Sequence, residues 1–119
     1  MNNISDDQID DAERSAKVLQ LNDAFRKSLT GGTVLMTAGV VALGADTQAA
    51  ILAAVRAFDT FDADNDPWNE HDFGALDLDG VRFFFKIDYF DLTRALYSTD
   101  PADPAVTERV MTIMLASEY

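Results

Sequence analysis

An acidic segment near the middle of the chain has part of the spacing of a cation-binding loop. Aspartate occupies alternate positions at Asp62, Asp64 and Asp66, and in calcium loops alternate side chains of this kind converge on one ion. The remaining positions do not fit, because the sixth, where glycine makes a sharp turn, is Pro67 and the twelfth, where a bidentate glutamate is needed, is Phe73. We therefore predict a solvated acidic loop, with a non-standard site for a hard cation as the alternative.

The only histidine of the chain, His71, lies between two acids, Glu70 and Asp72. Flanking carboxylates can orient an imidazole as a base or as a metal ligand. An alternative function is therefore a small metal-dependent enzyme, with catalysis by His71 together with Asp88 or Lys86. The metal ligands of that alternative would be Asp64, Asp66, Glu70 and His71. Because the chain has no second histidine and no cysteine, we predict instead that His71 and Asp72 fasten the loop to the following hairpin by hydrogen bonds.

The strongest functional signal is the distribution of charge. The interval between Arg56 and Arg82 contains no lysine or arginine. Two carboxylates about 7 Å apart in water repel by only roughly 0.6 kcal/mol, but a connected group of them builds a potential that attracts cations or basic proteins. The acids of this interval are Asp59, Asp62, Asp64, Asp66, Glu70, Asp72, Asp77 and Asp79.

Composition excludes several classes of function. The formal net charge of −12 argues against direct binding to nucleic acid or to an anionic membrane, because both require clustered lysine and arginine. The absence of cysteine excludes disulfides and thiolate chemistry and fits a reducing compartment. The chain has neither a secretory signal nor an apolar stretch that could span a bilayer. We expect a cytoplasmic protein without a membrane partner.

The elements that must position these residues indicate one α+β domain, in the order α-β-α-β-β-α, with a three-stranded, mainly antiparallel sheet packed against helices. We assign residues 22–119 to this domain and residues 1–21 to an acidic helical extension. Asp79-Gly80 is the signal of a tight turn between two strands. Helices are expected at about 6–28 and 46–58 and strands at 33–37, 73–78 and 81–89, followed by a last helix.

Alternation in the strand 81–89 predicts which side chains form the core. Successive side chains of a strand point to opposite faces of the sheet, so Phe83, Phe85, Ile87 and Tyr89 share one face, which we assign to the core. The other face carries Arg82, Phe84, Lys86 and Asp88, where a surface pair between Lys86 and Asp88 is expected. Phe84 would be exposed there unless a helix or a partner covers it.

Both terminal helices are predicted from capping residues. Ser5 and Gln8 have the spacing of a capping box, although the apolar residues of this first helix fall on two nearly opposite faces, so its first turns either pack elsewhere or are loosely held. Asp103 and Pro104 suit the N-cap and first position of the last helix. The apolar residues expected to face inward from that helix are Val106, Val110, Ile113 and Met114.

Four segments together carry a resemblance to a known family. They are Asn22–Arg26, Asn65–Gly74, Lys86–Asp91 and Thr112–Tyr119. On these segments the chain, over about Asn22–Tyr119, resembles the uncharacterised bacterial family named domain of unknown function 3768. The resemblance implies a short stand-alone protein, often carried with plasmid or other mobile-element genes, among which small acidic inhibitors of host defence are common. It implies no established reaction and transfers no catalytic residue.

We predict a non-enzymatic module that binds a basic protein surface and needs no cofactor. Because carboxylates can imitate phosphate charge, that surface could be the nucleic-acid-binding face of a defence or DNA-processing complex, which would make the chain a DNA mimic. A charge that serves only solubility is a further alternative, and an exposed sheet edge leaves pairing with a second copy open. The predicted partner contacts are Asp62, Asp64, Asp66, Trp68, Glu70, Asp72, Asp77, Asp79 and Phe84. A second acidic patch is predicted at Asp6, Asp7, Asp10, Asp11 and Glu13.

Overall fold

The computed structural model describes the backbone of residues 6–119 and the side chains from Asp10 onward. The capping box predicted at Ser5 and Gln8 lies outside the described residues, as do the acidic side chains of Asp6 and Asp7. No helix in the described part of the chain is both long enough and apolar enough to cross a membrane.

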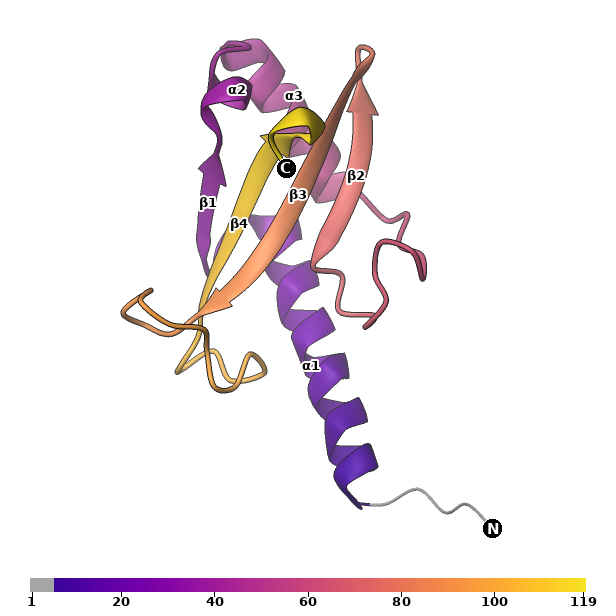
Figure 1. The fold of residues 1–119 in the computed structure, drawn as a ribbon, viewed down its shortest axis with the longest axis vertical. Helices are drawn as coiled ribbons and strands as arrows, with labels where there is room; N and C mark the ends of the chain where they lie inside the picture. Colours follow the sequence, from indigo (N-terminus) through magenta and orange to yellow (C-terminus); the bar gives the residue numbers. More distant parts are fainter. Residues whose placement is uncertain (1–5) are drawn as a thin grey trace.

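The protein is an α+β protein with one four-stranded mixed sheet. The strand order within residues 6–119 is β1-β4-β3-β2, with β1 and β4 parallel and the other two pairs antiparallel. In Figure 1 the two longer helices, α1 and α3, lie behind this sheet, so that one face is covered by helices. The elements are α1 (Asp6–Ser28), β1 (Thr33–Met36), α2 (Ala38–Val41), α3 (Ala45–Ala57), β2 (Phe73–Leu78), β3 (Val81–Phe90), β4 (Glu108–Leu115) and a short 3-10 helix, η1 (Ala116–Glu118).

The predicted last helix is wrong, because residues 108–115 form strand β4 at the centre of the sheet. A central strand is buried on both faces, and the adjacent residues Val110 and Met111 are indeed both buried. Such a strand is a continuous apolar run, which periodicity cannot distinguish from a buried helix. The turn itself forms, since the Asp103 carboxylate accepts the N–H of Ala105 at 2.9 Å, but no helix follows it. The sheet therefore has four strands and is mixed, and the element order differs from the predicted one.

Most other elements agree with the prediction. The first helix spans Asp6–Ser28, and α3 and the strand pair β2–β3 fall where expected, whereas the single-turn helix α2 was not predicted. The hairpin turn has positive φ at both Asp79 (53°) and Gly80 (80°), which is the type I′ geometry that matches the twist of the flanking strands.

The core lies between the covered face of the sheet and the two longer helices. Phe83, Phe85 and Ile87 of β3 are buried, as predicted, and pack with residues of α1 and α3 in a single cluster. Gly74 of β2 makes room for this packing, because a Cβ atom there would lie 2.3 Å from the Phe85 ring. Removing a buried phenylalanine of this kind typically costs about 3–5 kcal/mol.

The second half of α1 packs its apolar side chains against the domain. Val18 and Phe25 are buried, whereas Ala12 and Ala16 are exposed. Figure 1 shows the first turns of α1 extending beyond the sheet. Ala12 and Ala16, on the early turns, therefore do not meet the core.

Two arginines join the ends of α1 and α3. The buried Arg26 of α1 donates from Nη1 to the carbonyls of Val55 and Arg56, at 3.0 and 3.2 Å. In return Arg56 donates from Nε to the carbonyl of Lys27 at 2.8 Å. The last carbonyls of a helix lack partners within the helix and carry partial negative charge, so each arginine caps the C-terminus of the other helix.

Candidate functional site

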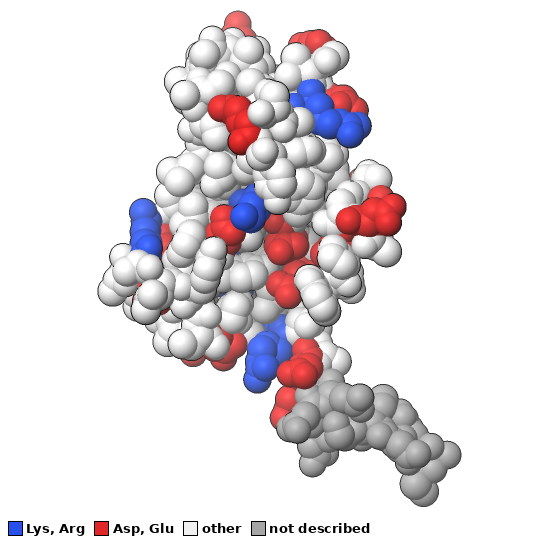
Figure 2. Space-filling model, viewed as in Figure 1, with Lys and Arg blue, Asp and Glu red and all other residues white. Residues whose placement is uncertain are grey.

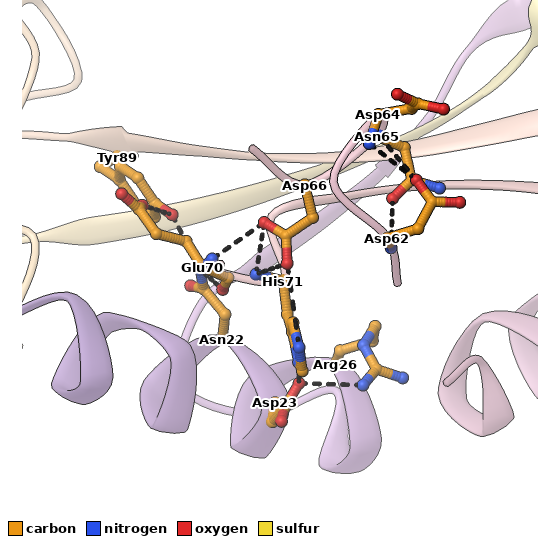
Figure 3. A network of polar contacts seen from close by, with 10 residues as sticks. All are labelled: Asn22, Asp23, Arg26, Asp62, Asp64, Asn65, Asp66, Glu70, His71 and Tyr89. Carbon is orange, nitrogen blue, oxygen red and sulfur yellow. Dashed lines mark hydrogen bonds and ion pairs between the residues drawn. The ribbon is translucent and has the colours of Figure 1, made fainter. Parts of the chain in front are cut away.

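The acidic segment forms a folded loop between α3 and β2, and its first turn uses one of its own aspartates. The Asp62 carboxylate accepts the backbone N–H groups of Asp64 and Asn65, at 2.9 and 3.0 Å. The side-chain oxygen of Asn65 accepts the N–H of Asp62 in return, at 3.1 Å. Figure 3 shows this turn, with the Asp64 carboxylate directed away from the rest of the loop. The alternating aspartates therefore build a turn and do not converge on one point.

Asp66 organises the second part of the loop from inside. Its side chain is only 2% exposed, and its carboxylate accepts the backbone N–H groups of Glu70 and His71, at 2.9 and 3.2 Å. The backbone around these two N–H groups turns tightly, because φ is positive at both Asn69 (53°) and His71 (57°). A carboxylate that satisfies two N–H groups in this way stabilises a backbone conformation that non-glycine residues seldom adopt.

His71 fastens this loop to α1 and not to the hairpin, which corrects the prediction. Its Nδ1 donates to the Asp23 carboxylate at 2.9 Å, and Nε2 lies 3.8 Å from Asp66. Burial alone would raise the pKa of Asp23, but hydrogen bonds from His71 and Arg26 outweigh it and lower that pKa. The imidazole is also stacked on the Phe61 ring, with 3.9 Å between ring centroids.

A buried polar cluster continues from the loop to β3 and β4. Asn22, which is fully buried, donates to the Tyr89 hydroxyl at 2.8 Å and to the Glu70 carbonyl at 2.9 Å. Its side-chain oxygen accepts Nε of Arg109 at 2.9 Å, and Tyr89 donates to the Glu70 carboxylate at 2.8 Å. Burial raises the pKa of Tyr89 and lowers the pKa of Arg109. We call the following residues the anchoring network: Asn22, Asp23, Asp66, Glu70, His71, Tyr89 and Arg109. Figure 3 shows all of them except Arg109.

Asp72 differs from the acids of the anchoring network. Its carbonyl accepts the N–H of Ile87 at 2.8 Å, so the predicted link between Asp72 and the hairpin exists through the main chain. Its half-buried carboxylate, however, has no hydrogen bond or ion pair to another residue within residues 10–119. Burial, followed by the nearby charges of Glu70, Asp66 and Asp88, raises the pKa of Asp72 to about 6. The fold therefore leaves this carboxylate without a partner among the described side chains.

Two hollows flank the loop. The first, of about 370 Å³, borders the anchoring network at Asp66 and His71. The second, of about 350 Å³, we call the Trp68 pocket, and its walls come from the loop, β2, β3 and the end of the chain. Trp68 and Tyr119 are 76% and 72% exposed. The Trp68 pocket is lined by Asp64, Asn65, Pro67, Trp68, Asp72, Phe73, Lys86 and Tyr119.

The structure does not gather all of the predicted partner residues into one area. Asp77 pairs with Arg82 at 3.1 Å, and with Asp79 it lies at the end of β2 away from the loop. Phe84 is half-buried, because the Phe73 and Tyr119 rings cover it, with centroids 5.1 and 5.5 Å away. On the face shown in Figure 2, acidic side chains occur in several places, some with basic ones beside them. The residues that come together around the Trp68 pocket are Asp64, Trp68 and Asp72.

The residues predicted as metal ligands in the alternative hypothesis are not brought together either. No group of three or more His, Asp or Glu residues within residues 10–119 is arranged to hold a metal ion. Asp66 and Glu70 are occupied by hydrogen bonds of the anchoring network, while Asp64 is exposed. Asp88 pairs with Lys86 at 3.4 Å, as predicted.

Sequence reasoning missed the residues that hold the loop in place. Asn22, Asp23 and Arg109 lie far from the acidic segment in sequence and gave no sign of contact with it. The available signal was that polar Asn22 and Arg26 share the apolar stripe of α1 with Phe25, and polar residues on a buried face usually have specific partners. Tyr119 was missed because its contact with Phe73 and Phe84 depends on the position of β4.

The fold and the loop define a small α+β protein in which a network of hydrogen bonds holds an acidic, tryptophan-bearing loop beside a mixed sheet. The model of the family described as "Protein of unknown function (DUF3768)" matches residues 36–118. This match covers more than half of the 119 residues, so the chain belongs to that family and the resemblance is confirmed. Segment 22–26, which contributed to the resemblance, precedes the matched range. No curated protein and no solved structure shows significant similarity to the chain.

Proposed function

We propose that this protein is a non-enzymatic interaction module that binds a basic surface of another protein through the loop between α3 and β2. The observation that carries the proposal is the position of Trp68, which is 76% exposed in a segment that has many carboxylates and no basic residue. Aromatic side chains dominate binding energy at protein interfaces, while surrounding charges speed encounter and select the partner.

The rigidity of the loop supports this proposal. Asp66 and His71 fix the loop to its own backbone and to α1 through hydrogen bonds of 2.9–3.2 Å. A loop that is already ordered loses less conformational entropy when it binds, so more of the contact energy appears as affinity. The anchoring network would thus hold Trp68 and the neighbouring acids in a binding conformation before the partner arrives.

The use of the titratable groups also favours binding over catalysis. The side chains that could act as acid, base or ligand at this site, Asp66, Glu70 and His71, are engaged in hydrogen bonds that hold the loop. A catalytic base needs hydrogen-bond access to a substrate proton. We therefore favour the interaction module over the metal-dependent enzyme.

A more specific form of the proposal is that the partner surface normally binds nucleic acid, as in a defence or DNA-processing complex. Duplex DNA carries one charge per about 1.7 Å of its axis, and a compact acidic loop can imitate only a short piece of it. We propose that the loop occupies part of such a surface. Duplex DNA should then compete for that surface and release the partner from the chain. A partner that does not bind nucleic acid would stay bound to the chain.

The test compares two acidic regions with equal changes of charge. We expect the immobilised chain to retain basic proteins from a bacterial lysate at physiological ionic strength, where the Debye length is about 8 Å. The double variant Asp59→Lys and Asp64→Lys should lose them, because both residues are exposed on the loop. The control, Asp10→Lys and Glu13→Lys on the exposed start of α1, should retain them. Capture of no basic protein, or equal loss by both variants, would show that the proposal is wrong.

A further inference from the structure

We propose that the Trp68 pocket is the binding site for a single arginine side chain of the partner, whose guanidinium would lie against the aromatic walls and within reach of Asp64 and Asp72. This inference rests on the proposed function and names the chemical group that the loop recognises. The proposed ligand is thus a cationic side chain of a protein, and not a metal ion or a free small molecule.

The lining of the pocket offers exposed aromatic surface to a planar cation. Trp68 and Tyr119 both line the pocket and keep most of their surface exposed. The Tyr119 ring is held in place by edge contacts with Phe73 and Phe84, at centroid distances of 5.9 and 5.5 Å. Guanidinium groups stack on such rings and are attracted by the negative potential of their faces, with tryptophan the strongest partner.

The charges around the pocket are negative overall. Asp64 and Asp72 contribute two carboxylates to the lining, and neither forms an ion pair with another side chain within residues 10–119. Lys86 also lines the pocket, but its ammonium group pairs with Asp88 at 3.4 Å. A bound cation would therefore meet two carboxylates that the fold leaves uncompensated.

The surroundings of Asp72 favour a cation beside its carboxylate. Burial and the neighbouring charges of Glu70, Asp66 and Asp88 raise its pKa to about 6. An opposite charge close to a carboxylate favours the ionised form, so a guanidinium in the pocket would relieve this unfavourable position. The volume of about 350 Å³ lies at the lower end of the range for small-molecule sites, which suits one long side chain.

The other hollow beside the loop does not share these properties. It is bordered by Asp62, Asp66 and His71, and each of these groups already serves another residue. Asp62 and Asp66 accept backbone N–H groups of the loop, and His71 donates to Asp23. A ligand there would have to compete with the hydrogen bonds that hold the loop together.

The proposal can be tested directly because Trp68 is the only tryptophan of the chain, so its fluorescence reports on this pocket alone. The full chain is titrated with a blocked Gly-Arg-Gly peptide, with the same peptide carrying citrulline, and with the same peptide carrying lysine. We expect a saturable change in emission with the arginine peptide. The citrulline peptide, which has nearly the same shape but no charge, should bind at least about tenfold more weakly, equivalent to about 1.4 kcal/mol. The lysine peptide should fall between them, because it cannot stack as a plane.

Variants locate the effect. Tyr119→Ala and the double variant Asp64→Asn and Asp72→Asn should each weaken binding of the arginine peptide by several-fold to tenfold, while Tyr119→Phe should bind like the natural chain. Two controls remove similar groups elsewhere: Tyr97→Ala, at a tyrosine that is 74% exposed, and Asp79→Asn at the hairpin turn. Both should bind the peptide unchanged. Thermal unfolding of each variant separates a folding defect from a lost contact.

The outcomes distinguish this inference from the proposed function. Equal binding of the arginine peptide and either comparison peptide, or equal effects of pocket and control variants, would overturn the arginine site. If basic proteins are still captured through the loop in that case, the interaction module stands and only its recognition of arginine is wrong. If neither the peptide nor any basic protein binds, both proposals fail.

Discussion

The anchoring network and the Trp68 pocket lie on one loop, yet they treat their carboxylates in opposite ways. In the anchoring network, Asp66 and Glu70 are matched with donors from the backbone and from Tyr89. In the Trp68 pocket, the carboxylates of Asp64 and Asp72 form no hydrogen bond or ion pair with another side chain within residues 10–119. For this reason we assign the anchoring network to stability of the fold and propose the Trp68 pocket for binding. Net charge alone cannot make this distinction, because all four residues are acidic.

The largest effect should follow from breaking the anchoring network at Asn22. Replacing it with leucine, as Asn22→Leu, removes the hydrogen bonds to Tyr89, Arg109 and the Glu70 carbonyl in a fully buried position. Buried polar groups left without partners cost about 1–3 kcal/mol each. We expect a loss of about 3–5 kcal/mol in the free energy of unfolding, measured by denaturant titration. Gln20→Leu, at an exposed position of the same helix, is the control and should change stability by less than about 0.5 kcal/mol. A small loss at Asn22 would show that the network contributes little to stability.

The second effect concerns the loop alone. Asp66→Ala leaves the N–H groups of Glu70 and His71 without their acceptor, and we expect a loss of about 2–3 kcal/mol. Asp66→Asn keeps one side-chain oxygen as an acceptor and should lose less. Hydrogen exchange at the amides of residues 70 and 71 checks the mechanism, because these amides should lose protection first in Asp66→Ala. If their protection is unchanged, Asp66 does not order the loop as described.

The sequence predicted the elements whose signals are local. The Asp79-Gly80 turn and the alternation in β3 depend on neighbouring residues, and both were confirmed. Strand β4 was not predicted, because its neighbours β1 and β3, which pair along its two edges, lie far away in sequence. At the site, the sequence indicated the acidic loop and its tryptophan. The sequence could not show that the Asp66 carboxylate is hydrogen-bonded and the Asp72 carboxylate is not, because this depends on the folded surroundings of each. Asp66 accepts the backbone amides that follow Asn69, whereas Asp72 is affected by side chains such as Asp88 of β3.

The third effect is a gain in stability, and its size depends on pH. The pKa of Asp72 is raised from 3.8 to about 6, so this residue contributes most to stability when protonated, below about pH 4. That contribution is lost as pH rises through about 6. The variant Asp72→Asn avoids the loss, and we expect it to be more stable than the natural chain at pH 7 by on the order of 1 kcal/mol, because solvent screens the charge of this half-buried side chain. The two proteins should converge near pH 4 when unfolding is followed by circular dichroism across this range. A difference between Asp72→Asn and the natural chain that stays constant across this range would contradict the assignment.

The smallest effect on stability is expected where the proposed binding surface is changed. Trp68 is 76% exposed, so Trp68→Ala removes little buried area and should change the free energy of unfolding by less than about 0.5 kcal/mol. Binding of a basic partner should nevertheless fall by about 2 kcal/mol or more, since an aromatic anchor of this kind typically dominates an interface. Calorimetric titration with a partner captured through the loop measures the second quantity, and denaturant titration measures the first. Leu96→Ala, at another large apolar residue with 71% exposure, should be neutral in both. A marked loss of stability in Trp68→Ala with unchanged binding would mean that the tryptophan serves the fold, and the contrast between the two regions would then disappear.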